Sequence, residues 1–168
     1  MKILTLVRHA KSDWKDTSLS DKQRPLNHRG ERDAPEMGRR IVGHGIRPSL
    51  ILASPAVRAW TTARIIADGI GYPTEFLQRE EPLYLASLDD LLDTIVAQDN
   101  GFNSLMVVGH NPGLTEFANF LVPGLTNNLP TAGVVSVQID RDDWKLYSQP
   151  ACELIVYDYP KLQFKESP

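Results

Sequence analysis

The stretch Ile3-Leu-Thr-Leu-Val7 is a short apolar run that is followed at once by Arg8 and His9. A run of this length is typical of a strand that is buried on both faces of a sheet. The charged pair that follows makes the stretch too short for a signal peptide or a membrane span. We therefore expect a central strand whose carboxyl end carries Arg8 and His9.

Further apolar runs of similar length recur along the chain. The runs that predict strands are Ser49–Ala53, Ser104–Val108, Val134–Ile139 and Glu153–Tyr157. Weaker patterns predict an edge strand at Trp144–Tyr147 and a short strand at Thr74–Leu77. The closing part of the chain is hairpin-like, which favours an antiparallel edge.

Helical patterns separate these runs. The predicted helices cover His28–Val42, Pro55 to about Asp68, Leu88–Gln98 and a segment that begins at Pro112. Asn27 and Ser54 are expected to cap the first two, and Ser87 with Asp90 has capping-box spacing before the third. Pro35 is expected to kink the first helix or to break its first turn. Strands that alternate with helices predict an α/β fold, a three-layer α/β/α sandwich with a mostly parallel central sheet.

Length and charge restrict the class of protein. A chain of 168 residues predicts a single domain, with residues 161–168 as a frayed tail. A net charge of −3 argues against nucleic acid or an anionic membrane as the partner. The lone Cys152 makes neither an internal disulfide nor a cysteine-built metal site. We expect a cytoplasmic protein that is a monomer or a weak dimer.

Basic and histidine side chains follow three of the predicted strands. Arg8 and His9 end the first run, Arg58 lies in the helix after the second, and His110 follows the third. The carboxyl ends of parallel strands lie at one edge of a sheet, where ligands bind, so these side chains are expected to converge. Helix N-termini near Pro55 and Pro112 would point backbone N–H groups at the same place.

Such a set of residues suits a phosphoryl group. Arginine presents a planar fork of donors that matches phosphate oxygens, and histidine can act as a nucleophile. A second histidine could donate hydrogen bonds to the oxygens on which transition-state charge is spread. A single histidine after a strand is more often structural, but three strand ends with this chemistry favour an anion pocket.

These residues resemble the histidine phosphatase superfamily, which includes the phosphoglycerate mutases. The matching blocks, in order, are Leu6-Val-Arg-His-Ala-Lys-Ser-Asp-Trp14, Arg24-Pro-Leu-Asn-His-Arg-Gly30, Ala53-Ser-Pro-Ala-Val-Arg58 and Val108-Gly-His-Asn-Pro-Gly113. The length, without a large insertion, is most similar to the small phosphohistidine phosphatase branch of SixA type. The resemblance spans Met1 to Tyr157 and implies a phosphoglycerate mutase-like fold.

The resemblance also implies roles for individual residues. His9 would be the nucleophile, Arg8 and Arg58 the phosphate clamps, and His110 the second histidine of the pocket. Arg24 matches a basic position that could reach the phosphate or the substrate. No metal or cofactor is expected. The loop residues Lys11, Ser12 and Trp14 are candidates for the pocket entrance, and Thr131–Gly133 for its border.

Two departures from the family pattern bear on the chemistry. Ala10 stands where the family usually has glycine, and Tyr84 or Leu85 stands where many members carry an acid that protonates the leaving oxygen. Glu80, Glu81 and Glu116 are the carboxylates that could replace it. An imidazole leaves more readily than an alkoxide, so the missing acid favours a phosphohistidine substrate.

Three functions follow as expectations. The first is a metal-independent phosphatase that forms a covalent phosphohistidine on His9 and acts on a phosphorylated protein. The second is a phosphatase or mutase for a small phosphorylated substrate on the same scaffold. The third is a phosphate-binding regulatory module without turnover, although such a module would have no need of His9.

Overall fold

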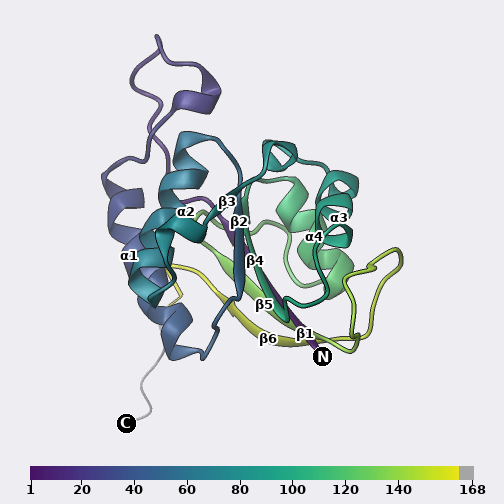
Figure 1. The fold of residues 1–168 in the computed structure, drawn as a ribbon. Coiled ribbons are helices and arrows are strands. Elements are labelled where there is room, and N and C mark those ends of the chain that lie inside the picture. The colour runs from purple at the N-terminus through teal and green to yellow at the C-terminus, as the bar shows by residue number, and fades with distance from the viewer. Residues whose placement is uncertain (163–168) are drawn as a thin grey trace.

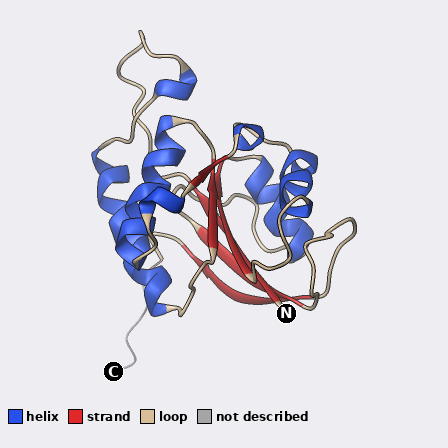
Figure 2. Ribbon diagram, in the orientation of Figure 1, coloured by secondary structure: helices blue, strands red, loops and turns tan. Residues whose placement is uncertain are grey.

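A computed structural model describes residues 1–162 and places a mixed sheet between two layers of helices (Figures 1 and 2). The described part of the chain forms six strands in the order β3-β2-β4-β1-β5-β6. They are β1 (Lys2–Arg8), β2 (Leu50–Ala53), β3 (Gln78–Arg79), β4 (Ser104–Gly109), β5 (Val134–Ile139) and β6 (Cys152–Asp158). The strands β3, β2, β4 and β1 are mutually parallel, and β5 and β6 add the antiparallel edge. This confirms the predicted fold class.

Within residues 1–162, α-helices cover both faces of the sheet (Figure 1). They are α1 (His28–Gly43) and α2 (Val57–Ile70) on one face, and α3 (Leu88–Val96) and α4 (Gly113–Leu121) on the other. Alternate side chains of β4 enter different cores: Leu105 and Val107 pack under α3 and α4, whereas Met106 and Val108 pack under α1 and α2. Strands that are buried on both faces explain why the apolar runs are continuous.

The first and third helices begin where the sequence predicts. The Asn27 side chain accepts a hydrogen bond from the Gly30 N–H at 2.9 Å, and Ser87 and Asp90 form the capping box. Of the two effects expected of Pro35, the broken first turn is wrong, because α1 continues through Pro35 as one helix of 16 residues. Its buried stripe, which includes Ala34 and Met37, packs against α2. Tertiary packing of this kind overrides local propensity.

The starts of α2 and α4 differ from the prediction. α2 begins at Val57 with Ala56 as its N-cap, so Ser54 is not the cap and Pro55 is not the first helical residue. The Ser54 hydroxyl instead accepts a hydrogen bond from the Ala56 N–H at 3.2 Å and contacts His110. α4 begins at Gly113, one residue after the predicted start at Pro112.

Two weakly predicted strands are wrong. Residues Thr74–Phe76 form the 3-10 helix η2, and the short strand β3 follows it. Trp144–Tyr147 is not a strand but part of the connection between β5 and β6. Trp144 is fully buried and its indole N–H donates to the Phe102 carbonyl at 2.8 Å. The buried Trp144 side chain therefore anchors this connection to the core.

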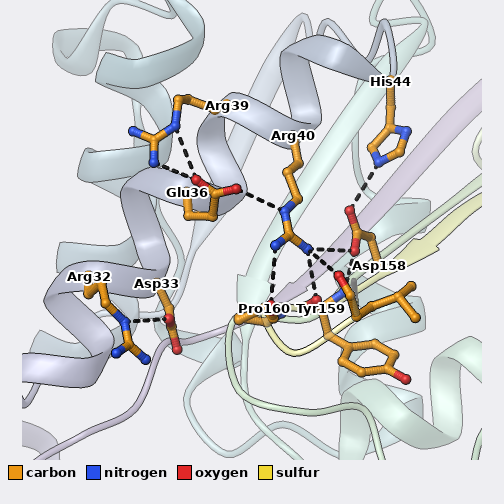
Figure 3. Close-up of polar contacts among 10 residues, drawn as sticks. Arg32, Asp33, Glu36, Arg39, Arg40, His44, Asp158, Tyr159 and Pro160 are labelled. Carbon is orange, nitrogen blue, oxygen red and sulfur yellow. Dashed lines mark hydrogen bonds and ion pairs between the residues drawn. The ribbon is translucent and has the colours of Figure 1, made fainter. Parts of the chain in front are cut away.

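An ion-pair network ties the end of β6 to α1 (Figure 3). The buried Asp158 carboxylate accepts from Arg40 at 3.0 Å and lies 3.1 Å from the His44 ring nitrogen. Arg40 also donates to the carbonyl oxygens of Tyr159, Pro160 and Leu162, so residues 161–162 of the predicted tail lie against α1. Residues 163–168 lie outside the described residues. No helix between residues 1 and 162 is both long and apolar enough to span a membrane.

Candidate active site

The register of the two central strands brings the two site histidines together. Arg8 at the end of β1 pairs with Gly109 at the end of the parallel β4. His9 and His110 therefore leave neighbouring strands at the same edge, and their ring centroids are 5.2 Å apart. The backbone N–H of His9 continues the strand pairing by donating to the Gly109 carbonyl at 3.0 Å.

A cavity of about 230 Å³ opens at this edge. It is lined by Arg8, His9, Lys11, Ser12, Trp14, Asp21, Arg24, Arg58, Leu85, His110, Asn111 and Thr131. The lining includes the five residues to which the resemblance assigns roles and the three entrance candidates, and of Thr131–Gly133 it includes Thr131. The three candidate acids, Glu80, Glu81 and Glu116, are absent from it, and Glu81 pairs with Lys22 at 3.0 Å.

His9 is held as a neutral ring with a defined tautomer. Its Nδ1 lies 2.8 Å from the Ala10 carbonyl oxygen, which can only accept, so Nδ1 carries the proton and Nε2 presents a lone pair. Burial lowers the pKa of His9 to about 4, and the positive charges of Arg58 and Arg8 act in the same direction. The hydrogen bond to Ala10 acts the other way but does not compensate. His9 is therefore neutral near pH 7.

His110 is also buried and neutral. Burial lowers its pKa to about 3, with further lowering by His9 and Arg58. Its Nε2 lies 2.7 Å from the Ser54 hydroxyl oxygen, and its buried Nδ1 has no hydrogen-bond partner among the described residues.

The two predicted clamp arginines are fixed in different ways. Arg58 is 2 % exposed and donates to both the backbone carbonyl and the carboxylate of Asp21, at 2.6 and 2.9 Å. Arg8 donates to the Leu129 carbonyl at 2.9 Å. In both side chains the buried Nε–H lacks a partner within residues 1–162. Unsatisfied buried donors are rare, and here they suit an anion in the cavity.

Arg24 lines the same cavity, but several of its donors are already engaged. Its Nε donates to the Asp21 carboxylate at 3.1 Å and its Nη1 to the Ser12 hydroxyl at 2.7 Å. The guanidinium also stacks on the Trp14 ring, 3.4 Å from the ring centroid. Arg24 therefore adds positive charge to the site and fixes Trp14 at the rim.

Asp21, in the 3-10 helix η1 (Asp21–Gln23), is a site residue that the sequence analysis missed. Its carboxylate accepts from Arg24, Arg58 and the Tyr84 hydroxyl. Partial burial acts to raise the pKa of this carboxyl, but the hydrogen bonds from Tyr84 and Arg58 outweigh it and lower the pKa to about 2. The available signal was physical: buried arginines need a nearby anion, and Asp21 precedes Arg24 by three residues.

The position expected for the family's acid carries no carboxylate. The Tyr84 ring lies edge-on to His110 with centroids 5.6 Å apart, and Leu85 lines the cavity. Leu85 has a φ of 47°, which non-glycine residues adopt rarely and at some cost in energy.

The backbone beside His9 accepts Ala10 without a clash. Its methyl group is fully buried in the core beneath α1 and α2, and its N–H donates to the Thr62 hydroxyl at 3.0 Å. The tight approach lies one residue further on, where a Cβ at Gly30 would overlap the Lys11 carbonyl oxygen. Gly30 therefore lets α1 approach the loop that leaves His9.

The side chains that could bind a metal ion are not clustered within the part of the chain that the structure describes. No group of three or more His, Cys, Asp or Glu side chains within residues 1–162 has an arrangement that could hold a metal ion.

Comparison with known proteins agrees with this geometry. Residues 4–81 match the sequence profile of the histidine phosphatase superfamily (branch 1). The chain belongs to this superfamily. Among histidine phosphatases of known structure, a candidate phosphohistidine phosphatase SixA from Agrobacterium tumefaciens is 27% identical with a TM-score of 0.81, over 95% of this chain and 98% of that one.

Two further relatives extend the comparison. A protein histidine phosphatase SixA in complex with tungstate has the same fold, with a TM-score of 0.78, 22% identity and coverage of 94% of this chain and 97% of that one. An uncharacterized chloroplastic protein of Arabidopsis thaliana is 31% identical over 150 residues, which cover 84% of this chain and 68% of the relative. The superfamily and the fold expected from the sequence are thereby confirmed.

Proposed function

We propose that this protein is a metal-independent phosphatase that dephosphorylates a phosphorylated histidine of a protein through a covalent intermediate on His9. The observation that carries the proposal is the state of His9. A buried, neutral imidazole presents its Nε2 lone pair beside three arginines in a small cavity. A neutral imidazole can attack phosphorus, whereas an imidazolium cannot.

The first step transfers the phosphoryl group to the protein. The Nε2 lone pair of His9 forms a bond to phosphorus while the bond from phosphorus to the substrate nitrogen breaks. The bonding pair stays with that nitrogen, and a substrate ring whose other nitrogen carries a proton leaves as neutral imidazole. The Ala10 carbonyl, 2.8 Å from His9 Nδ1, stabilises the positive charge that develops on the His9 ring.

The second step is hydrolysis. Water attacks the phosphorus atom, the bond to Nε2 breaks, and the pair returns to His9. Both protons of the water leave with the product as dihydrogen phosphate, so His9 is restored in its starting tautomer. In each step Arg8, Arg58 and His110 would hold the phosphoryl oxygens, where electrostatic stabilisation contributes most.

The acid chemistry of the cavity favours a nitrogen leaving group. Asp21 is the carboxylate of the lining, and its low pKa and its bonds to two arginines keep it ionised. An ionised carboxylate cannot protonate an alkoxide. A phosphohistidine carries its own ring proton and needs no such acid.

The surroundings of the cavity suit a macromolecular substrate. A second hollow shares Lys11, Ser12 and Trp14 with the site and continues past Lys15, His28 and Arg29. Asp13 also lines it, so the hollow is mixed but has a basic excess. Segments that flank a phosphorylated histidine could lie there. The similarity to the Agrobacterium tumefaciens protein, which is named as a candidate phosphohistidine phosphatase, supports the same substrate class.

A substrate panel tests the proposal. We expect release of phosphate from a phosphohistidine peptide to exceed that from phosphoserine peptides and from sugar or glycerate phosphates in kcat/KM, with no change on addition of EDTA. Preference for a small phosphomonoester would support the phosphatase or mutase alternative. Binding of tungstate without turnover of any donor would indicate a regulatory module.

A further inference from the structure

The Ser54 side chain is fully buried at the end of β2, between the backbone and the second site histidine. Its oxygen lies 2.7 Å from His110 Nε2 and accepts a hydrogen bond from the Ala56 N–H at 3.2 Å. A hydroxyl group has one proton to donate. The Ala56 N–H is a donor and cannot take that proton, and the other contact of this hydroxyl among the described residues is His110 Nε2. His110 Nε2 is the acceptor that remains.

This geometry determines which nitrogen of His110 carries the proton. A neutral imidazole has one N–H, so a ring that accepts at Nε2 must be protonated at Nδ1. That nitrogen is the buried atom of His110 without a partner in the described chain. The ring itself forms part of the cavity wall beside His9.

The tautomer matters because His110 does not carry a charge that would make both nitrogens donors. With the opposite tautomer, Nδ1 would present a lone pair to phosphoryl oxygens, and the two would repel. With Nδ1 protonated, a neutral His110 donates to them. The direction of one hydrogen bond therefore decides whether this histidine assists or opposes the reaction.

We propose that Ser54 is a positioning residue that fixes His110 in the Nδ1–H tautomer and so makes it a hydrogen-bond donor to the transferred phosphoryl group. The proposal deepens the proposed function and rests on it for the identity of the ligand. A serine at the opposite end of β2 provides the contrast. Ser49 precedes β2, and its hydroxyl donates to the Ser104 carbonyl at 2.9 Å, at the end remote from the site.

Nitrogen-15 NMR of the histidine rings tests the tautomer directly in the unmodified protein. We expect His110 to show a protonated Nδ1 and an unprotonated Nε2 at pH 7, and the Nδ1–H resonance to shift when tungstate is added. His28→Gln and His44→Gln assign the remaining signals, because neither residue lines the cavity. A protonated His110 Nε2 in the free protein would overturn the proposal. So would a His110 Nδ1–H resonance that does not shift when tungstate is added.

Substitution of Ser54 tests the consequence for turnover. Ser54→Ala is expected to lower kcat about tenfold to a hundredfold with a smaller change in KM, because the lost interaction acts on transition-state charge. Its spectrum should show a mixture of His110 tautomers, and Ser54→Thr, which keeps a hydroxyl donor, should restore the Nδ1–H form. Ser49→Ala is the matched control and should change neither property.

The outcomes separate this proposal from the proposed function. The NMR and tungstate measurements need no turnover, so an inactive protein that shows the Nδ1–H tautomer and the tungstate shift would retain the role of Ser54 and refute the phosphatase assignment. An active phosphatase in which Ser54→Ala leaves the tautomer and kcat unchanged would refute the role of Ser54 alone.

Discussion

The two ends of the parallel strands differ in what their cavities contain. At the amino ends, a cavity of about 770 Å³ is lined mainly by apolar side chains, with Arg47, Ser49 and the Tyr72 hydroxyl as its polar members. At the carboxyl ends, the cavity of about 230 Å³ holds three arginines, two histidines and Asp21. The larger cavity therefore has fewer charged and titratable side chains than the smaller one.

Unpaired buried polar atoms mark the difference more sharply than volume does. Within residues 1–162, the buried side-chain nitrogen or oxygen atoms without a partner are Arg8 Nε, Arg58 Nε and His110 Nδ1. All three belong to residues of the smaller cavity. Leaving such groups unsatisfied costs stability, so their concentration at one end indicates a site prepared for an anion.

The largest difference between the two cavities is expected when one arginine is removed from each of them in turn. Arg58→Ala is expected to lower kcat/KM about a thousandfold and to weaken tungstate binding, because it removes charge-assisted bonds and one of the partners of Asp21. Arg47→Ala should change neither. Titration with tungstate and steady-state kinetics check both variants. Equal tungstate affinity in Arg58→Ala and the unmodified protein would remove Arg58 from the site.

Acid should destabilise the protein through the two histidines at the carboxyl ends of the strands. The pKa values of His9 and His110 are lowered to about 4 and about 3 in the folded state. Between pH 6.5 and 4 the unfolded chain therefore binds protons that the folded protein does not, and stability falls as the pH falls. At pH 5 each histidine contributes a loss of up to about 2 kcal/mol.

Urea unfolding at pH 7 and pH 5 measures this effect. The double variant His9→Asn/His110→Asn should lose less stability between the two pH values than the unmodified protein. The exposed His28 serves as the control, and His28→Gln should leave the difference unchanged. An identical pH dependence in the double variant would show that the two site histidines are not held neutral.

The role of Asp21 should be smaller than that of Arg58. Asp21→Asn keeps the shape but removes the charge that orients two arginines, and we expect kcat/KM to fall about tenfold. The exposed Glu75, near the apolar cavity, is the matched control, and Glu75→Gln should have no effect. A loss as large as that of Arg58→Ala would instead assign Asp21 a direct part in the chemistry.

The basic hollow beside the site should have the smallest effect, and only on protein substrates. Lys15→Glu/Arg29→Glu is expected to lower kcat/KM several-fold for a phosphohistidine peptide with acidic flanks, because exposed ion pairs contribute about 0.2–1 kcal/mol each. Neutral flanks should abolish the difference. Lys145→Glu/Lys161→Glu, with the same change in charge, is the control. Equal rates on both peptides in the unmodified protein would contradict a role for the hollow.

The strand pattern predicted the site residues that follow strands, and the family resemblance predicted Arg24, but neither predicted Asp21. Parallel register alone places His9 beside His110, so buried runs and their following residues were sufficient. Asp21 and Tyr84 lie in connections whose paths depend on tertiary contacts with Arg58 and with each other. No local pattern encodes those contacts.

The errors in secondary structure have similar causes. Serine is a common N-cap residue, but the Ser54 hydroxyl contacts His110 instead. The helix α2 begins later, with Ala56 as its N-cap. Trp144 resembles a strand residue because it is apolar, yet it lies in a loop and its side chain is buried. In both cases a side chain serves a distant partner, which a reading of local propensity cannot detect.

The central claim is that His9 carries the phosphoryl group, and trapping the intermediate tests it most directly. The protein is mixed with a radiolabelled phosphohistidine peptide and quenched rapidly without acid. We predict label on the protein that survives alkali and is lost in mild acid, as expected of a phosphoramidate. The label should be absent from His9→Ala and still detectable in His110→Ala. Acid-labile label that accumulates on His9→Ala would contradict the account, because the nucleophile would then lie elsewhere.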